Sequence, residues 1–498
     1  MQNGTLLAAI DLGSNSFRLE IGRLDHGHVQ RVEYLKETVR QGNGLDSERN
    51  LSPEAMQRGW DCLARFSERL GGFKRSQVRA VATQTLREAR NRDDFLQQAT
   101  KILGFPIDVV SGREEARLIY MGVAHLLPQS DERRLVIDIG GRSTELILGQ
   151  GYQSQRTESY RLGSVAWSMK YFDTGRLDAA NFQRAEVAAQ AILDEATGSF
   201  EASQWDVAYG SSGTVGAVAD ILAGKGYGTG SVTRSGLDWL YGALLSAGHI
   251  DKVTLIGLKD DRRAVIGGGV AILRALFDLL QLTRLNVAEG ALRNGLLIDL
   301  LDREDADTDV RSASIQRLAT NFSVDAPHAQ RVATATAYFL EQLVREEPQA
   351  HRERLLRKAR WAAQVHEIGA RISHTDYHKH GAYILDNADA PGFAQPELHR
   401  LSMLVFGHRG KLKKLGEALD DIDFAHQILA LRLAVIVCHA RRAPDTQDLV
   451  VNKTADGFEL QVSTRWQSTY PQSIHLLQEE VLAWQKTGTT LRIKFVAN

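Results

Sequence analysis

The sequence has few of the features that mark secreted, membrane-spanning or metal-finger proteins. Its 498 residues include only two cysteines. Cys62 and Cys438 lie far apart and outside any Cys-x-x-Cys spacing, so no disulfide framework is expected. The chain runs from Met1 through one short apolar segment to Asp11 without the basic and apolar regions of a signal peptide. Because no run of about twenty apolar residues occurs either, we predict a cytoplasmic protein without integral membrane association.

The sequence also lacks an excess of charge of either sign. Its 60 lysines and arginines balance 61 aspartates and glutamates, and the net charge is −1 at pH 7. A balanced total does not indicate a polyanion partner, which has to be argued from local clusters, and no nucleic-acid partner is expected. With 43% hydrophobic and 24% charged residues, the composition is that of a globular protein. The length exceeds what one hydrophobic core usually serves, so several domains are predicted.

Two copies of one strand–turn–strand pattern organise the N-terminal part of the chain. Strand-like runs at 6–10 and 17–21 flank the first turn, and runs at 135–139 and 145–148 flank the second. Amphipathic helical stretches alternate with short strand-like runs after each copy. This alternation indicates an α/β fold.

The pattern changes twice further along the chain. The stretch Asp302–Asp309 is highly charged and poor in apolar residues, as in an exposed interdomain connection. Beyond it the pattern is almost purely helical, and after Pro444 strand-like alternation returns. The predicted domains are 1–130, 131–302, 303–443 and 444–498, the last a small α+β module.

The two turns carry the residues that point to chemistry. They read Asp11-Leu-Gly-Ser-Asn-Ser16 and Asp138-Ile-Gly-Gly-Arg-Ser-Thr144. Glycines and hydroxyl residues after a strand-end carboxylate let backbone N–H groups face one phosphate, while the carboxylate binds Mg²⁺. One such turn is more often an ordinary hairpin, in which the aspartate bonds its own backbone. Two copies favour loops that face each other across a phosphate chain, with Asp11 and Asp138 converging on the metal.

A candidate general base follows from a predicted helix start. Ser111 and Glu114 have the Ser-x-x-Glu spacing of a capping box, which gives Glu114 a structural role. Glu115 is not needed for the cap and sits in a first helical turn, where the helix dipole favours its ionised form. An ionised carboxylate that faces a phosphate can activate water. The alternative, which the residues alone favour, is that Glu115 only serves the dipole.

Two further glycine clusters are weaker signals. Gly210-Ser-Ser-Gly-Thr214 lies between a strand and an apolar helix, so either anion binding or close helix packing accounts for it. Gly267–Gly269, after Arg262 and Arg263, receives no catalytic role, because such glycines often only permit close helix approach. The sequence has no Gly-x-x-x-x-Gly-Lys-Ser/Thr motif, which excludes a P-loop.

Six motifs together resemble those of a known family. They are Ala9-Ile-Asp-Leu-Gly-Ser-Asn-Ser-Phe-Arg18, Ala82-Thr-Gln-Thr-Leu-Arg-Glu-Ala-Arg-Asn91, Ser111 to Gly122, Val136 to Leu146, Gly210 to Thr214 and Gly290-Ala-Leu-Arg-Asn-Gly295. The chain resembles the long members of the exopolyphosphatase and guanosine pentaphosphate phosphohydrolase family, within the superfamily of actin, heat-shock ATPases and sugar kinases. The resemblance implies two actin-like (ribonuclease H-like) α/β domains around a cleft, a mostly helical HD-like domain, a small α+β tail and a homodimer.

The resemblance also implies roles for residues of the loops. Glu115 matches the family's catalytic glutamate, and Asp138 and Glu145 match acidic residues that, with Asp11, organise Mg²⁺ and the attacking water. The predicted substrate-binding residues are Gly13, Ser14, Asn15, Ser16, Arg87, Gly140, Gly141, Arg142, Ser143, Thr144, Ser212 and Gly213. Arg142 departs from the family pattern, since many relatives have a third glycine or alanine there. Its side chain either binds phosphate through two hydrogen bonds or points outward into solvent.

The helical C-terminal part carries histidines and basic residues. A working metal centre of the HD type needs a His-Asp pair, whereas this chain has His366-Glu367, so an independent dinuclear site is not expected. Histidines packed in a core are the alternative. The residues predicted to line a polyanion channel are His378, Lys379, His380, His408, Arg409, Lys411, Lys413 and Lys414, although a charged run is more often a solvated face.

These observations predict a phosphoanhydride hydrolase. We expect an exopolyphosphatase that releases orthophosphate from inorganic polyphosphate with Mg²⁺, because the basic C-terminal tract favours a long polyanion. The alternative is hydrolysis of the 5′-terminal phosphate of guanosine pentaphosphate (pppGpp). A more remote alternative is a kinase or ATPase of the actin-like superfamily, for which no acceptor site is recognised.

Overall fold

The computed structural model describes residues 1–26, 28–128, 130–303, 309–443 and 445–497. The chain divides into two compact units, Met1–Asp309 and Val310–Asn498, which are described one at a time. Most of the predicted interdomain connection, residues 304–308, lies outside the described residues, as does Pro444 at the other predicted boundary. The four predicted domain limits therefore stay predictions.

The first unit begins with a lobe built on a five-stranded sheet, here called the first lobe. Its strands in spatial order are β3 (His28–Glu37), β2 (Phe17–Asp25), β1 (Leu6–Leu12), β4 (Val78–Ala82) and β5 (Ile107–Val109). Its helices are α1 (Pro53–Arg69), α2 (Gln84–Glu88), α3 (Arg92–Leu103) and α4 (Gly112–Ala124), with the 3₁₀ turn η1 (Gln41–Gly44) after β3. β1 is buried at all but its first position, because it is apolar apart from Asp11 and both faces of the sheet are covered.

A second lobe repeats this plan on a six-stranded sheet. Its strands in spatial order are β10 (Ser231–Thr233), β11 (Arg284–Val287), β9 (Val207–Ser211), β6 (Arg133–Ile139), β7 (Thr144–Gln150) and β8 (Gln153–Tyr160). Its helices are α5 (Ser164–Tyr171), α6 (Ala179–Leu193), α7 (Gly213–Lys225), α8 (Arg234–Ala247), α9 (Asp260–Arg263), α10 (Ile266–Leu279) and α11 (Leu292–Asp302). In both lobes an antiparallel three-stranded meander leads into a parallel strand beside its first member. The predicted pair of actin-like domains is confirmed.

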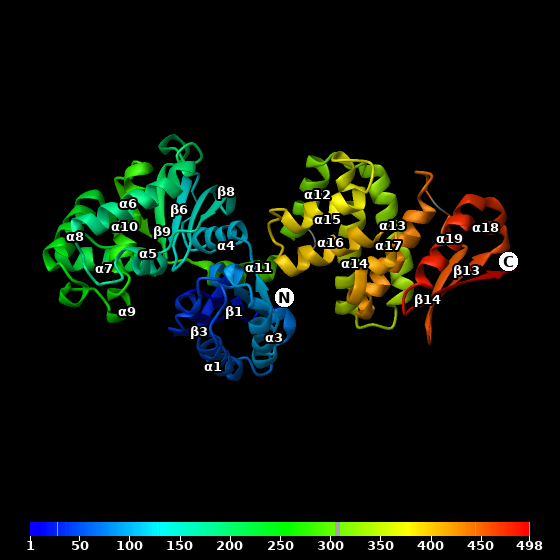
Figure 1. Cartoon of the computed structure of the whole chain (residues 1–498), viewed down its shortest axis with the longest axis horizontal. Helices are drawn as coiled ribbons and strands as arrows, with labels where there is room; N and C mark the ends of the chain where they lie inside the picture. Colours follow the sequence, from blue (N-terminus) through cyan, green and yellow to red (C-terminus); the bar gives the residue numbers. More distant parts are fainter. Residues whose placement is uncertain (27, 129, 304–308, 444, 498) are drawn as a thin grey trace. The chain divides into compact units, whose positions relative to one another are not determined.

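The two lobes exchange their last helices. Tyr120 of α4 packs against β7 of the second lobe, where a Cβ at Gly149 would lie 2.3 Å from its ring, while Leu297 of α11 lies over β2 of the first lobe. The two helices cross at backbone contact, because a Cβ at Gly295 would lie 1.8 Å from the carbonyl oxygen of Leu118. Figure 1 shows α4 and α11 between the two sheets. Glycine is required at this crossing by close approach.

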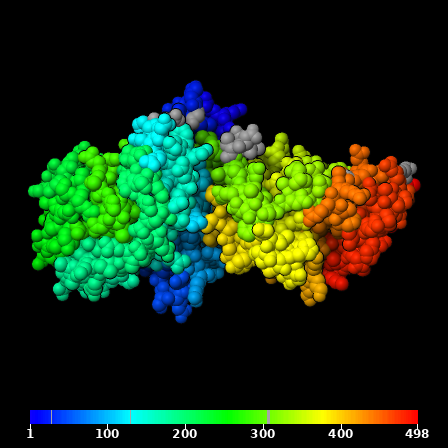
Figure 2. All heavy atoms as spheres, turned by 90° about the horizontal axis from the view of Figure 1, so that it is seen from above, coloured from blue at the N-terminus to red at the C-terminus, as the bar shows by residue number. Residues whose placement is uncertain are grey.

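The second unit is mostly helical and ends in a three-stranded sheet. Its helices are α12 (Val310–Asn321), α13 (Ala326–Leu343), α14 (Gln349–Gln364), α15 (Tyr377–Asn387), α16 (Gln395–Gly407), α17 (Ile422–Val437), α18 (Thr464–Thr469) and α19 (Pro471–Trp484), and its strands are β12 (Leu449–Thr454), β13 (Gly457–Ser463) and β14 (Thr490–Val496). One hydrophobic core joins the helices to the sheet, with Leu429, Leu460 and Trp484 among its members. A buried ion pair between Arg432 and Glu480 connects α17 with α19. Figure 2 shows this unit, from yellow-green to red, as one continuous body.

Within the described ranges, no helix is both long enough and apolar enough to cross a membrane.

Candidate active site

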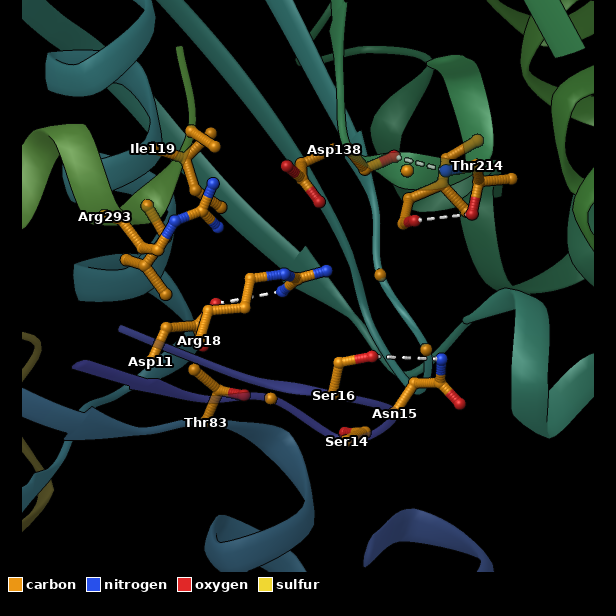
Figure 3. A pocket seen from close by; sticks show the side chains of 18 of the residues that line it. Asp11, Ser14, Asn15, Ser16, Arg18, Thr83, Ile119, Asp138, Thr214 and Arg293 are labelled. Carbon is orange, nitrogen blue, oxygen red and sulfur yellow. Dashed lines mark hydrogen bonds and ion pairs between the residues drawn. The ribbon is translucent and has the colours of Figure 1, made fainter. Parts of the chain in front are cut away.

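A polar cavity of about 310 Å³ lies between the two lobes of the first unit. Both predicted loops line it, and so does the turn before α7. Figure 3 shows Asp11, Asp138 and Thr214 around one space, with Arg18 between the two aspartates. The predicted site residues that line the cavity are Asp11, Gly13, Ser14, Asn15, Ser16, Glu115, Asp138, Gly140, Gly141, Ser143, Ser212 and Gly213. The structure thus brings most of the predicted residues together from distant parts of the sequence.

The first loop is the β1–β2 hairpin turn, and η1 fixes its backbone. The amide of Gly42 donates to the carbonyl of Ser14 at 2.8 Å, and the amide of Arg40 donates to that of Asn15 at 2.9 Å. Because the carbonyls of Ser14 and Asn15 accept these hydrogen bonds, the two loop residues keep one backbone conformation. Asp11 leads into this turn as the strand-end carboxylate.

The second loop is the β6–β7 turn, and the start of α5 holds it. The amide of Gly140 closes the turn by donating to the carbonyl of Ser143 at 2.9 Å, and the amides of Val165 and Ala166 donate to the carbonyl of Gly141. A Cβ at Gly163 would lie 2.3 Å from the amide nitrogen of Arg142. The N-terminal turn of α5 therefore rests directly on the loop backbone.

The third cluster lies at the N-terminus of α7. Ser212 has φ 99°, and its hydroxyl accepts from the amide of Thr214. The Thr214 hydroxyl in turn donates to the carbonyl of Ile139 at the end of β6. A helix N-terminus that faces a cavity attracts anions. This turn joins the other two loops around the same space.

Three carboxylates, those of Asp11, Glu115 and Asp138, line the cavity, and a fourth, that of Glu145, lies buried close to the last two. Glu115 accepts a 2.9 Å hydrogen bond from Arg87. Burial raises the pKa of Glu115 to about 7 against the opposing effect of Arg87, and Asp11 and Asp138 raise it further. Burial likewise raises the pKa of Asp138 to about 6. Burial and then repulsion from Glu115 and Asp138 raise the pKa of Glu145 well above its ordinary value.

The helix that carries Glu115 is anchored by its neighbours. The Ser111 hydroxyl accepts from the amide of Glu114, as the predicted helix start requires. The carboxylate of Glu114 binds Arg117 at 2.8 Å, and Arg117 also binds Asp299 of α11 at 2.6 Å. All three side chains are buried. This network fixes α4 against the exchanged helix α11.

Four predicted site residues do not line the cavity. The Thr144 hydroxyl donates to the carbonyl of Leu162 at 2.5 Å, and Glu145 accepts from Ser159 at 2.8 Å. Arg87 is engaged with Glu115. Arg142 neither enters the cavity nor points into open solvent, because its guanidinium binds Glu88 at 2.9 Å and the carbonyl of Gly42 at 3.2 Å.

Several cavity residues were missed by sequence reasoning. Arg18 binds Asp11 at 3.0 Å, Lys36 of β3 binds Asp261 of the second lobe at 3.0 Å, and a Cβ at Gly213 would lie 2.0 Å from the guanidinium of Arg262. Tyr34 and Arg293 also line the cavity, and the Arg293 guanidinium lies 5.0 Å from the centre of the Tyr34 ring. Arg18 and Arg293 belong to two of the six family motifs but received no role from them, whereas Tyr34 and Lys36 come from a segment without a motif. Only the approach of the lobes brings them to one rim.

The predicted polyanion channel lies in the second unit, and two of its three histidines are buried. His378 is 6% exposed and His408 is 2% exposed. Burial lowers the pKa of His378 to about 4, and that of His408 well below its ordinary value. Lys379 is paired with Asp376, and Lys414 donates to the carbonyl of Arg409. At neutral pH neither of these two buried histidines thus adds positive charge to the tract.

Two histidines of the second unit lie near a carboxylate. One ligand atom each of His328, His366 and Glu367 lies within 4.8 Å of the others. Arg441 binds both carboxylate oxygens of Glu367, at 2.8 and 3.1 Å, and also binds Asp325. The guanidinium thus already neutralises this carboxylate.

The buried His366 predicts acid sensitivity of the second unit. Burial lowers its pKa from 6.5 to about 4, so the unfolded chain binds more protons between these values. Stability is therefore complete above pH 6.5 and falls as the pH drops toward 4, by about 3 kcal/mol for this group. Thermal unfolding at pH 7 and pH 5 measures the loss.

A matched pair of variants assigns that pH dependence. His366 and the exposed His439 each place Nδ1 against the carbonyl three residues earlier. His366→Asn reduces the slope of stability against pH between 6.5 and 5, to which the buried His378 and His408 also contribute, whereas His439→Asn leaves the slope unchanged. An unchanged slope in His366→Asn would show that this histidine is not the titrating group.

Comparison with known proteins identifies the family. The Ppx/GppA phosphatase family matches residues 21–304, and Ppx/GppA phosphatase, domain III, matches residues 310–483. A relative from Vibrio cholerae serotype O1, named guanosine-5'-triphosphate,3'-diphosphate pyrophosphatase, is 38% identical over 98% of this chain and 98% of its own. A relative of the same name from Vibrio vulnificus is 37% identical over 99% of both chains.

Solved structures support the fold. An exopolyphosphatase from Cytophaga hutchinsonii is 21% identical, with a TM-score of 0.54 over 60% of this chain and 98% of its own. The PPX-GPPA enzyme of Aquifex aeolicus is 23% identical, with a TM-score of 0.51 over 59% of this chain and 99% of its own. At these identities the likeness shows the fold alone.

The prediction of an exopolyphosphatase is wrong. The relatives that align with the whole chain at 37–38% identity carry the guanosine pentaphosphate name instead. The preference for polyphosphate rests on the basic C-terminal tract. Two histidines of that tract, His378 and His408, are buried, so they do not form part of a basic surface. The two paired loops and the full-length relatives together show that the chain belongs to the Ppx/GppA phosphatase family and is a hydrolase of phosphoric anhydrides.

Proposed function

We propose that the chain hydrolyses the 5′-terminal phosphoanhydride of guanosine 5′-triphosphate 3′-diphosphate and releases orthophosphate. The observation that carries this proposal is the shared name of relatives that align over 98–99% of the chain. The cavity supports it, because three N–H-rich turns at its inner end suit a terminal phosphate. Lys36, Arg262 and Arg293 at the rim suit the second phosphate group of such a nucleotide.

The carboxylates support a divalent cation, which we propose to be Mg²⁺. Asp11, Asp138 and Glu145 offer the hard oxygen ligands that Mg²⁺ prefers. Their burial together raises the pKa of Asp138 and Glu145, so a cation near them would relieve their repulsion. When bound, the metal neutralises the charge that spreads over the phosphate oxygens during transfer.

Residues of the chain itself carry out the other steps of the reaction. Glu115 accepts a proton from the water that attacks the terminal phosphorus, and Arg87 fixes the position of that carboxylate through a 2.9 Å hydrogen bond. Backbone amides of the turns at Gly13–Ser16 and Gly141–Ser143 hold the phosphate oxygens in place. Because the transition state of phosphoryl transfer is largely dissociative, these donors contribute more than the base does. The phosphorus–oxygen bond to the leaving nucleotide then breaks.

A comparison of substrates tests the proposal. Orthophosphate release is measured from pppGpp, GTP and long-chain polyphosphate at equal concentrations of terminal phosphate. We expect the highest kcat/KM with pppGpp, and a lower value with GTP, which lacks the 3′-diphosphate. Faster turnover of GTP than of pppGpp would contradict the proposal, and so would release from none of the three.

Removal of the metal gives a second prediction. EDTA abolishes phosphate release, added Mg²⁺ restores it, and Asp138→Asn lowers kcat at least about 100-fold because it removes a charged ligand. Arg133→Gln is the matched control on the same strand, since the exposed Arg133 pairs with Asp206 at the far end of β6. Full activity of the EDTA-treated protein would exclude the metal.

A further inference from the structure

Arg142 is, with Thr144, one of two residues of the second loop that do not line the cavity. Its guanidinium reaches across to the first lobe, where it binds Glu88 of α2 and the carbonyl of Gly42 in η1. Its side chain is 22% exposed and that of Glu88 is 10% exposed. A charge pair this far from water is stronger than a surface ion pair.

Glu88 belongs to a continuous chain of hydrogen bonds. Its other carboxylate oxygen accepts from the side-chain amide of Gln84 at 2.5 Å. The amide oxygen of Gln84 accepts from Arg87 at 3.1 and 2.6 Å, and Arg87 donates to Glu115 at 2.9 Å. The order is therefore Arg142, Glu88, Gln84, Arg87 and Glu115.

The ends of this chain belong to different parts of the site. Arg142 comes from the second phosphate loop, the three middle members lie on the five-residue helix α2, and Glu115 lies on α4. Through Gly42, Arg142 also touches η1, which holds the carbonyl of Ser14 in the first phosphate loop. One side chain thus connects the second loop with the first loop and with the candidate base.

We infer that Arg142 is a positioning residue, which holds the carboxylate of Glu115 in place through Glu88, Gln84 and Arg87 when the two lobes meet. This inference rests on the proposed role of Glu115. In a variant without Arg142, Glu88 loses its cationic partner from the second loop. Arg87 is then an alternative partner, because Glu88 and Arg87 both already bind Gln84. Arg87 would then be drawn from Glu115 toward Glu88. A small displacement of a catalytic group costs rate rather than substrate affinity.

Kinetics of single variants with pppGpp give the first test. We expect Arg142→Gln and Glu88→Gln each to lower kcat about tenfold with KM changed less than twofold, and Arg142→Lys to recover part of the loss. The double variant should be no worse than either single one, because both remove the same connection. Arg133→Gln, which breaks an exposed ion pair on β6, is the control and should retain the parental kcat and KM.

A second set of variants tests whether the effect of Arg142 on kcat passes through Glu115. In the Glu115→Gln background, Arg142→Gln should cause no further loss in single-turnover rate. A rise in KM with unchanged kcat would overturn the inference in favour of direct phosphate binding by Arg142. An equal loss in both backgrounds, or no loss in either, would also overturn it. Failure of the proposed function is distinguishable, because the parental protein itself would then release no phosphate from pppGpp or would release it faster from GTP.

Discussion

Glu115→Gln lowers kcat for phosphate release by about 10²- to 10⁴-fold and leaves KM within a few-fold of the parental value. The amide keeps the shape of the side chain but cannot accept a proton from water. Arg87 keeps its bonds to Gln84 and to the carbonyl of Val110, so the surrounding structure stays in place. Initial rates over a range of pppGpp concentrations measure both constants.

The neighbouring glutamate supplies the control for this experiment. Glu114 lies on the same helical turn, but its carboxylate binds Arg117 and is 1% exposed. Glu114→Gln weakens a buried ion pair and therefore lowers the free energy of unfolding by about 1–3 kcal/mol. Its kcat should fall far less than that of Glu115→Gln. If Glu115→Gln kept more than a tenth of the parental kcat, the role of Glu115 as base would be refuted.

Gly295→Ala lowers the free energy of unfolding by about 4 kcal/mol, the other large effect that the structure predicts. The added Cβ would lie 1.8 Å from the Leu118 carbonyl oxygen and 3.2 Å from the amide nitrogen of Gly122. Both are backbone atoms, so α4 and α11 must move apart. Because α4 carries Glu115, activity falls together with stability. Urea denaturation and phosphate release measure the two effects.

Gly242 is the matched glycine for this comparison. It lies within α8, and a Cβ there meets nothing within 4 Å. Gly242→Ala should stabilise the chain by up to about 1 kcal/mol, since alanine favours a helix interior. Equal effects of the two substitutions would contradict the close crossing of α4 and α11.

The strands and turns of the phosphate loops follow directly from sequence. The apolar run of β1 ends at Asp11, and glycine with hydroxyl residues leaves the chain few conformations other than a tight turn. The repeat of this pattern at Asp138 indicates two lobes of the same plan from the sequence alone. Ser111 marked the start of α4 because its hydroxyl satisfies a helix N-terminal amide.

Other parts of the site depend on contacts that no local pattern encodes. β8 reads Gln-Ser-Gln-Arg-Thr-Glu-Ser-Tyr and has no apolar alternation, and it forms because β7 offers a free edge. Glu88 and Arg142 are 54 residues apart and in different lobes. The resemblance identified Arg87 as a phosphate contact, whereas the structure places it on Glu115. Its role with substrate stays a prediction.

The exchange of α4 and α11 has a consequence for synthesis on the ribosome. The sheet of the first lobe is complete once β5 has emerged, yet the helix that covers one of its faces ends at Asp302. Until then Leu7 and Ala9 on that face have no lasting cover. Domains usually fold as units from the N-terminus during translation, but here the first lobe has to wait for the second. Contacts this distant in sequence slow folding and expose apolar surface meanwhile, so nascent chains that stop between the two lobes are the ones most in need of a chaperone.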